Sequence, residues 1–280
     1  MILIHQILNV ACLLLWLNWR SIGFVTIDST AKLSLLSTLK RTEPKFAARW
    51  LYLVSLLALL LIRGLFYWHM GSATNWTPVI DLIAITLPFR SDYFLPMLIF
   101  SASSFGLLLA GFYGWLLLIS AVNHKVTDSD PFQKLLRFHL GWLERFPAIM
   151  RFFLPTLIAA LLWVLVNPGL ERLGIIPAPV STNLLWQQAA LLGIAAVLVW
   201  KFLLLGLLLL HLLNTYVYLG NAPFWHFVNL TARSLLRPVA WLPLRIGRVD
   251  LSPVVGIAAV LFIETLGRNW LPLLYQRLPF

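Results

Sequence analysis

Long apolar runs alternate with polar, arginine-rich segments along most of this chain. A transmembrane helix needs about 20 mostly apolar residues. Six runs meet this requirement, at roughly Ile2–Trp19, Ala48–Met70, Tyr93–Val122, Met150–Val166, Leu184–Leu213 and Leu251–Leu266. The third and fifth runs are the longest, so we expect them to tilt or to extend beyond the hydrocarbon. The pattern predicts an all-α membrane protein with about six transmembrane helices.

Composition supports this class. The chain is 60% hydrophobic and 11% charged, whereas a soluble domain carries about 25% charged residues. A net charge of +11 would suggest nucleic acid in a soluble protein. Here we interpret it as basic loops that face anionic lipid, and no nucleic-acid partner is expected. The single cysteine, Cys12, excludes a disulfide framework within the chain and a CxxCH haem attachment motif.

The basic residues are distributed unevenly between the loops. Of the 21 basic residues, 15 follow the first, third and fifth apolar runs. The positive-inside rule therefore predicts three cytoplasmic loops and both termini on the opposite side. The first run lacks a basic leading segment and a small-residue cleavage site, so we interpret it as a retained helix.

The three basic loops resemble one another in the spacing of their asparagines and prolines. Asn123 and Pro147 are 24 residues apart, as are Asn214 and Pro238, and a looser copy runs from Asn18 to Pro44. The second and third copies share a Pro-Phe pair, at Pro131-Phe132 and Pro223-Phe224. This pattern predicts three tandem helical hairpins of the same topology, at residues 1–70, 93–167 and 184–280.

Each of the last two loops contains an amphipathic segment. In "DPFQKLLRFHLGWLERFP" the apolar stripe is Phe132, Leu135, Leu136, Leu140 and Leu143. In "APFWHFVNLTARSLLRP" it is Phe224, Phe227, Val228, Leu235 and Leu236, with Arg233 and Arg237 on the polar side. Such segments favour the membrane interface. They are either connectors held by lipid headgroups or a cytoplasmic platform for a partner.

The block from Pro223 to Phe262 resembles the signature of the YggT family of small bacterial membrane proteins. The matching residues are Leu236-Arg237-Pro238, Leu242-Pro243, Gly247 and Asp250-Leu251-Ser252-Pro253. The resemblance implies an integral protein of the bacterial inner (plasma) membrane without catalytic activity. Members of that family are associated with osmotic or extracytoplasmic stress and ion homeostasis. Other relatives are associated with division-site or nucleoid organisation, and plastid ones with haem attachment to a b-type cytochrome.

The same block suggests local roles for its residues. Ser252 is a candidate N-cap, Pro253 suits the first helical turn, and Asp250 places negative charge near the helix start. Arg245 and Arg248 lie where headgroup phosphates are expected. They either extend towards the headgroups or form an anion or lipid site with the helix N-terminus.

Ionisable residues inside the apolar runs are the candidate functional groups, because each is costly unless paired or solvated. Arg63 and Glu264 have similar predicted depths, so they either pair or reach the outer interface independently. Lys201, with His211 farther along the same run, is either part of a polar track for an ion or a side chain that reaches towards the interface or faces a partner subunit. A channel or transport component using Lys201, Arg63 and Glu264 is the alternative function.

The sequence contains no HExxH, GxSxG or P-loop motif, and no enzyme activity or cofactor is expected. A b-type haem requires two histidines at similar depth on facing helices, and His124 with His211 is the pair to test. The predicted function is a non-enzymatic scaffold or accessory subunit. Its expected partners are anionic lipids and either a membrane protein or a second copy of the chain.

Overall fold

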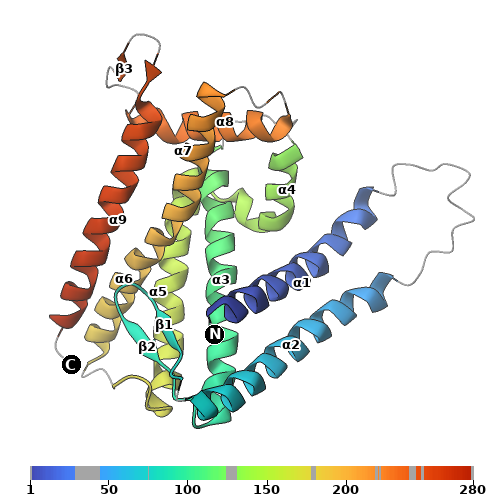
Figure 1. Cartoon of the computed structure of the whole chain (residues 1–280), viewed down its shortest axis with the longest axis vertical. Helices are drawn as coiled ribbons and strands as arrows, with labels where there is room; N and C mark the ends of the chain where they lie inside the picture. Colours follow the sequence, from blue (N-terminus) through green and yellow to red (C-terminus); the bar gives the residue numbers. More distant parts are fainter. Residues whose placement is uncertain are drawn as a thin grey trace, which may run out of the picture. The chain divides into compact units, whose positions relative to one another are not determined.

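A computed structural model describes residues 2–28, 45–74, 76–123, 131–177, 181–217, 220, 222–239, 244–246 and 249–278. Its helices are α1 (Ile2–Asp28), α2 (Lys45–Thr74), α3 (Phe94–Val122), α4 (Pro131–Leu140), α5 (Ala148–Arg172), α6 (Thr182–Val197), α7 (Lys201–Tyr216), α8 (Pro223–Leu236) and α9 (Ser252–Gln276). Two short strand pairs accompany them, β1 (Val79–Asp81) with β2 (Thr86–Pro88), and β3 (Arg245–Ile246) with β4 (Val249–Asp250) (Figure 1).

Five helical stretches of the described chain are long and apolar enough to cross a membrane. They are Arg49–Gly71, Phe94–Val122, Ala148–Arg172, Thr182–Tyr216 and Ser252–Gln276. The second to sixth predicted runs are therefore confirmed as candidate spans. The first run is helical too, as α1, but it is not among these five. The chain is thus an all-α, multi-pass membrane protein.

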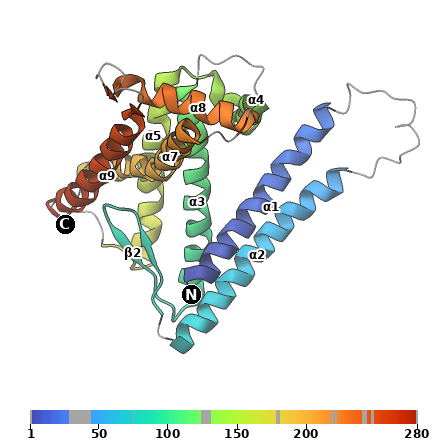
Figure 2. The same cartoon turned by 45° about the horizontal axis from the view of Figure 1, so that its top comes forward.

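The chain divides into two compact units, each described by itself. The first consists of residues 1–80 and 88–110, and the second of residues 81–87 and 111–280. In the first unit, α1 and α2 pack along each other and run in opposite directions (Figures 1 and 2). A small apolar cluster of Cys12, Leu56 and Phe105 joins both helices to the first part of α3.

In the second unit, α5 packs extensively along α6. A Cβ built on Gly193 of α6 would lie 2.6 Å from the backbone oxygen of Thr156 in α5. No side chain fits between these two backbones, so glycine sets their separation, as small residues do at membrane helix interfaces.

Substituting Gly193 by alanine is expected to destabilise the protein by about 1–3 kcal/mol, because α5 and α6 must separate to admit the methyl group. Gly206→Ala in α7 is the matched control, since nothing lies within 4 Å of its added Cβ. The melting temperatures of the two purified variants in detergent test this. Equal melting temperatures would contradict the close packing of α5 and α6.

The fifth predicted run forms two α-helices, α6 and α7, which are joined directly by a 3₁₀ turn at Leu198–Trp200. The backbone oxygen of Val199 accepts a hydrogen bond from Trp115 Nε1 of α3 at 3.2 Å. Trp200 is buried and packs on Phe152 of α5 with 4.9 Å between ring centroids. A 3₁₀ turn within a helix releases carbonyl groups for such contacts, and this one fixes the helix immediately before Lys201.

The pair β1–β2 was not predicted from the sequence. At its tip the carboxylate of Asp81 accepts a hydrogen bond from the backbone N–H of Ile83 at 2.7 Å. Ile83 has φ of 69°, a left-handed conformation that is uncommon for a β-branched residue. The Asp81 side chain stabilises this turn locally.

Candidate functional site

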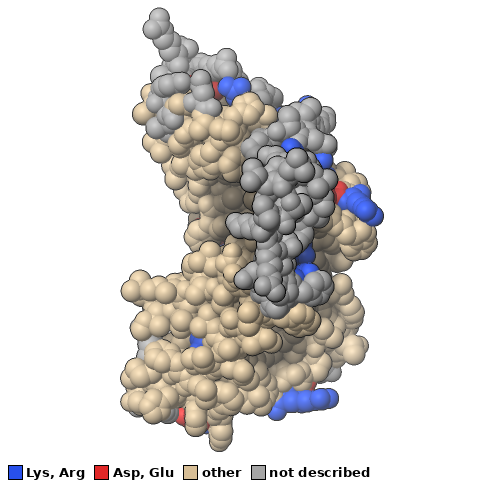
Figure 3. All heavy atoms as spheres, turned by 90° about the vertical axis from the view of Figure 1, so that its right-hand side faces the viewer, with Lys and Arg blue, Asp and Glu red and all other residues tan. Residues whose placement is uncertain are grey.

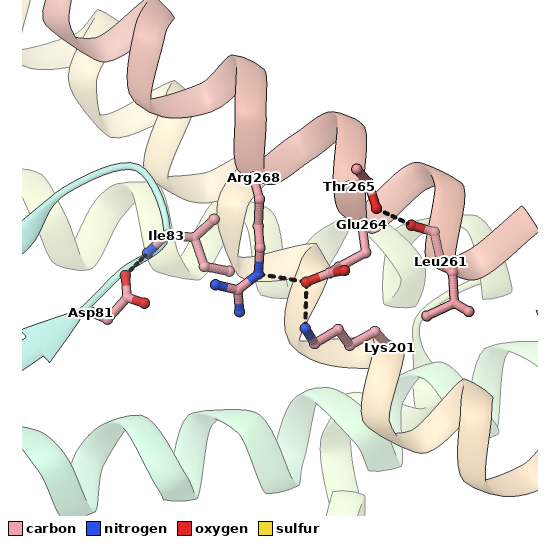
Figure 4. Close-up of polar contacts among 7 residues, drawn as sticks. All are labelled: Asp81, Ile83, Lys201, Leu261, Glu264, Thr265 and Arg268. Carbon is pink, nitrogen blue, oxygen red and sulfur yellow. Dashed lines mark hydrogen bonds and ion pairs between the residues drawn. The ribbon is translucent and has the colours of Figure 1, made fainter.

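The second unit holds an ion-pair group within its helices. Lys201 Nζ donates to Glu264 Oε1, and Arg268 Nε donates to the same oxygen at 2.5 Å (Figure 4). The side chains of Lys201 and Glu264 are 16% and 15% exposed, whereas that of Arg268 is 48% exposed. Lys201 and Glu264 are therefore each other's main compensation, and Arg268 adds a more exposed second cation.

Helix packing explains why Glu264 reaches Lys201. Helix α9 packs against α6 and α7. A Cβ built on Gly267 would lie 2.5 Å from a methyl carbon of Leu198 in the 3₁₀ turn. The glycine thus lets α9 approach the turn that precedes Lys201, one helical turn from Glu264.

The first unit holds a second polar group, centred on Arg63 of α2. Arg63 is 1% exposed. Its Nη1 donates to Asn9 Oδ1 of α1 at 2.7 Å, and its Nη2 donates to Ser104 Oγ of α3. The Tyr67 ring lies 5.3 Å from the guanidinium carbon. Three helices thus supply neutral acceptors and an aromatic ring to one buried cation.

The remaining contacts of this group form a consistent hydrogen-bond network. The side-chain oxygen of Asn9 accepts from Ser104 Oγ at 3.2 Å. The side-chain nitrogen of Asn9 therefore donates to His5 Nε2, 3.1 Å away. A neutral His5 then carries its proton on Nδ1 and donates to Tyr67 Oη at 2.9 Å. In this arrangement His5 Nδ1 does not accept from Arg63 Nη2, although they are 3.5 Å apart.

Arg63 and Glu264, for which pairing was one of two alternatives, each have described partners within their own unit. Glu264 bonds to Lys201 and Arg268, and Arg63 bonds to Asn9 and Ser104. Counting residues along helices estimated their depth but not their neighbours. Asn9 and Ser104 were missed because single uncharged polar residues in apolar runs give a weak signal.

The amphipathic helices α4 and α8 pack together in the second unit. The rings of Phe132 and Phe227 stack with centroids 5.1 Å apart, and Phe227 joins Leu136 and Leu140 in one core cluster with α3. Asn123 Nδ2, directly after α3, donates to Thr231 Oγ1 of α8 at 2.8 Å. The predicted apolar stripes therefore mostly face inward, although Leu135 is 54% exposed.

The opposite face of α8 is polar and basic. His226, Arg233 and Arg237 are exposed there, around a shallow depression of about 440 Å³ that Asn229, Leu230 and Ser234 also line. His211 of α7 is buried and bonds to Asn229 with its Nδ1 2.8 Å from Oδ1. Arg233 and Arg237 thus project from a helix whose other face is fixed to the bundle. On the face of the molecule drawn in Figure 3, most of the described surface carries neither acidic nor basic side chains.

The segment before α9 differs from its predicted capping. Asp250 Oδ1 accepts from the backbone N–H of Ser252 at 2.9 Å, and Ser252 is the first helical residue. The N-cap is therefore Leu251, which makes no side-chain capping bond, and Asp250, the residue before the N-cap, satisfies the Ser252 N–H. Pro253 is buried in the first turn as expected. Pro238 is exposed in the 3₁₀ turn after α8. The side chain of Arg245, with Gly247, Arg248 and His124, lies outside the described residues.

Among the described residues there is no cluster of three or more His, Cys, Asp or Glu side chains that could hold a metal ion. No known family model matches the chain, and no curated protein or solved structure is significantly similar to it. The YggT resemblance therefore stays a prediction. Fold and site together define a multi-pass helical membrane protein whose described residues include internal charged groups at Arg63 and at Lys201 with Glu264, and a basic face on α8.

Proposed function

We propose that the protein is a non-enzymatic scaffold or accessory subunit of a membrane complex. The basic face of α8 is the observation that carries this proposal. Phe227, Thr231 and Leu236 hold the other side of the helix in the bundle, so Arg233 and Arg237 are presented on a fixed support. A fixed array of exposed cations suits an acidic segment of a partner membrane protein.

The internal charges favour this role over ion transport for the second unit. Lys201 and Glu264 bond to each other, which suits a structural link between α7 and α9. A transport function would therefore depend on Arg63, whose described hydrogen-bond partners include no carboxylate.

We propose α1 as a sixth span, which gives three tandem hairpins with the basic loops in the bacterial cytoplasm. The order of elements supports a repeat. Helix α3 is followed by the short α4, a 3₁₀ turn and α5, while α6–α7 is followed by α8, a 3₁₀ turn, the β3–β4 pair and α9. The Pro-Phe pairs lie at the starts of α4 and α8, and the ring centroids of Phe132 and Phe224 are 6.0 Å apart. Involvement in envelope or osmotic stress rests on the YggT resemblance alone.

Reversing both charges, Arg233→Glu with Arg237→Glu, tests the scaffold. Native electrophoresis of mildly solubilised membranes should show the wild type in a complex of discrete size, and the variant as the free chain. Arg172→Glu with Arg277→Glu is the control, since both of these arginines are exposed elsewhere. A wild type that migrates alone, or a complex that survives the α8 reversal, would refute the proposed docking face.

A further inference from the structure

Arg63 is a buried cation in a candidate membrane span without a described acidic partner. It lies eight residues from Gly71, the end of its span, or about 12 Å at ~1.5 Å per residue. Among the described residues its hydrogen bonds go to an amide and a hydroxyl oxygen. Neutral dipoles offset part of the cost of burying a charge but do not cancel the charge.

The guanidinium also retains an unused donor. Arg63 Nε is buried and has no hydrogen-bond partner, while the other two nitrogens already bond to Asn9 and Ser104. An unpaired N–H on a cation in a low-dielectric environment is a strong attractor for an anion. Thus the unmet hydrogen bond and the unmet charge belong to the same group.

We propose that Arg63 holds a small monovalent inorganic anion, of the halide type, at its Nε–H. A larger oxyanion such as phosphate or sulfate needs several converging donors, and the donors on Asn9 and Ser104 are already committed within the network. A halide needs no fixed set of donors. It would balance the one charge that the three helices leave uncompensated.

Access is shortest from the end where α1 begins. His5 is three residues from the first residue of α1, and it is partly exposed. Its ring bonds to Asn9 and Tyr67, which both contact Arg63. Movement of this one ring would open the network, so the anion can exchange with solvent without separation of the helices.

The test is the melting temperature of the purified full-length protein in detergent, in chloride and in gluconate at matched ionic strength. We expect chloride to raise the melting temperature by several degrees over gluconate, and bromide to act like chloride. Bromide-soaked crystals should show an anomalous peak beside Arg63 Nε. Equal melting temperatures in chloride and gluconate would overturn the proposal.

Asn9→Asp provides the sharpest variant, because it places a carboxylate where the Asn9 oxygen lies 2.7 Å from Arg63 Nη1. This internal counter-ion should abolish the chloride effect, whereas exposed Asn183→Asp should preserve it. Cys12, buried one turn from Asn9, supplies another control. Cys12→Ala should retain the chloride effect of the wild type, whereas a chloride effect that appears only in Cys12→Ala would assign the counter-ion role to the thiol instead. None of these outcomes depends on the α8 docking face.

Discussion

Glu264→Gln is expected to lower the yield of folded protein several-fold, because it leaves Lys201 without its carboxylate. Lys201 lies 15 residues from Tyr216 at one end of its span, or about 23 Å at ~1.5 Å per residue. A lysine at this depth is costly unless paired. A loss of stability of about one or two kcal/mol can change the abundance of a protein in cells several-fold. Quantitative fluorescence size-exclusion chromatography of the tagged protein measures the yield of folded protein.

The double variant Lys201→Gln with Glu264→Gln separates the ion pair from general effects of the substitutions. Two neutral amides can still bond to each other, so the double variant should recover much of the yield lost by Glu264→Gln alone. Arg90→Gln breaks an ion pair whose side chains are 76% and 63% exposed, and should have little effect. Lys201→Gln alone is measured as well. A double variant whose loss of yield equals the sum of the losses in Lys201→Gln and Glu264→Gln would contradict the pairing.

How much the sequence reveals differs between helices and contacts. The length of the apolar runs located the second to sixth candidate spans, and the helical spacing of apolar residues located the two amphipathic helices. In contrast, the partner of Glu264 depends on which helices are neighbours, and α9 lies against α7 with Gly267 close to a methyl group of Leu198. A glycine's packing role has no signature in a single sequence.

Short-range polar contacts were also difficult to predict, for a different reason. Asp250 and Ser252 are both good capping residues, and the choice between them depends on where α9 begins by a single residue. The β1–β2 pair was overlooked because its strands have three residues each, which is too short for a period-two pattern. Its useful signal was Asp81, two residues before the left-handed Ile83.

Arg63→Ala is expected to destabilise the protein by about 3 kcal/mol, the largest effect in the first unit. The change leaves a cavity at a side chain that is 1% exposed. It also removes a donor from both Asn9 and Ser104, which are themselves buried. α1, α2 and α3 would lose their shared polar contact together.

Arg49→Ala is the matched control on the same helix. Arg49 lies over the Trp19 ring, 5.1 Å from its centroid, and is partly exposed, so its loss should cost only about 0.5–1 kcal/mol. Thermal unfolding of both variants in gluconate, without halide, isolates the protein contacts from any bound anion. Equal losses in Arg63→Ala and Arg49→Ala would mean that the Arg63 network contributes no more than an interfacial contact. We expect the larger loss for Arg63→Ala. If adding Asn9→Leu and Ser104→Ala to Arg63→Ala then reduces that loss, the stabilisation comes from hydrogen bonds that these three residues satisfy only as a set.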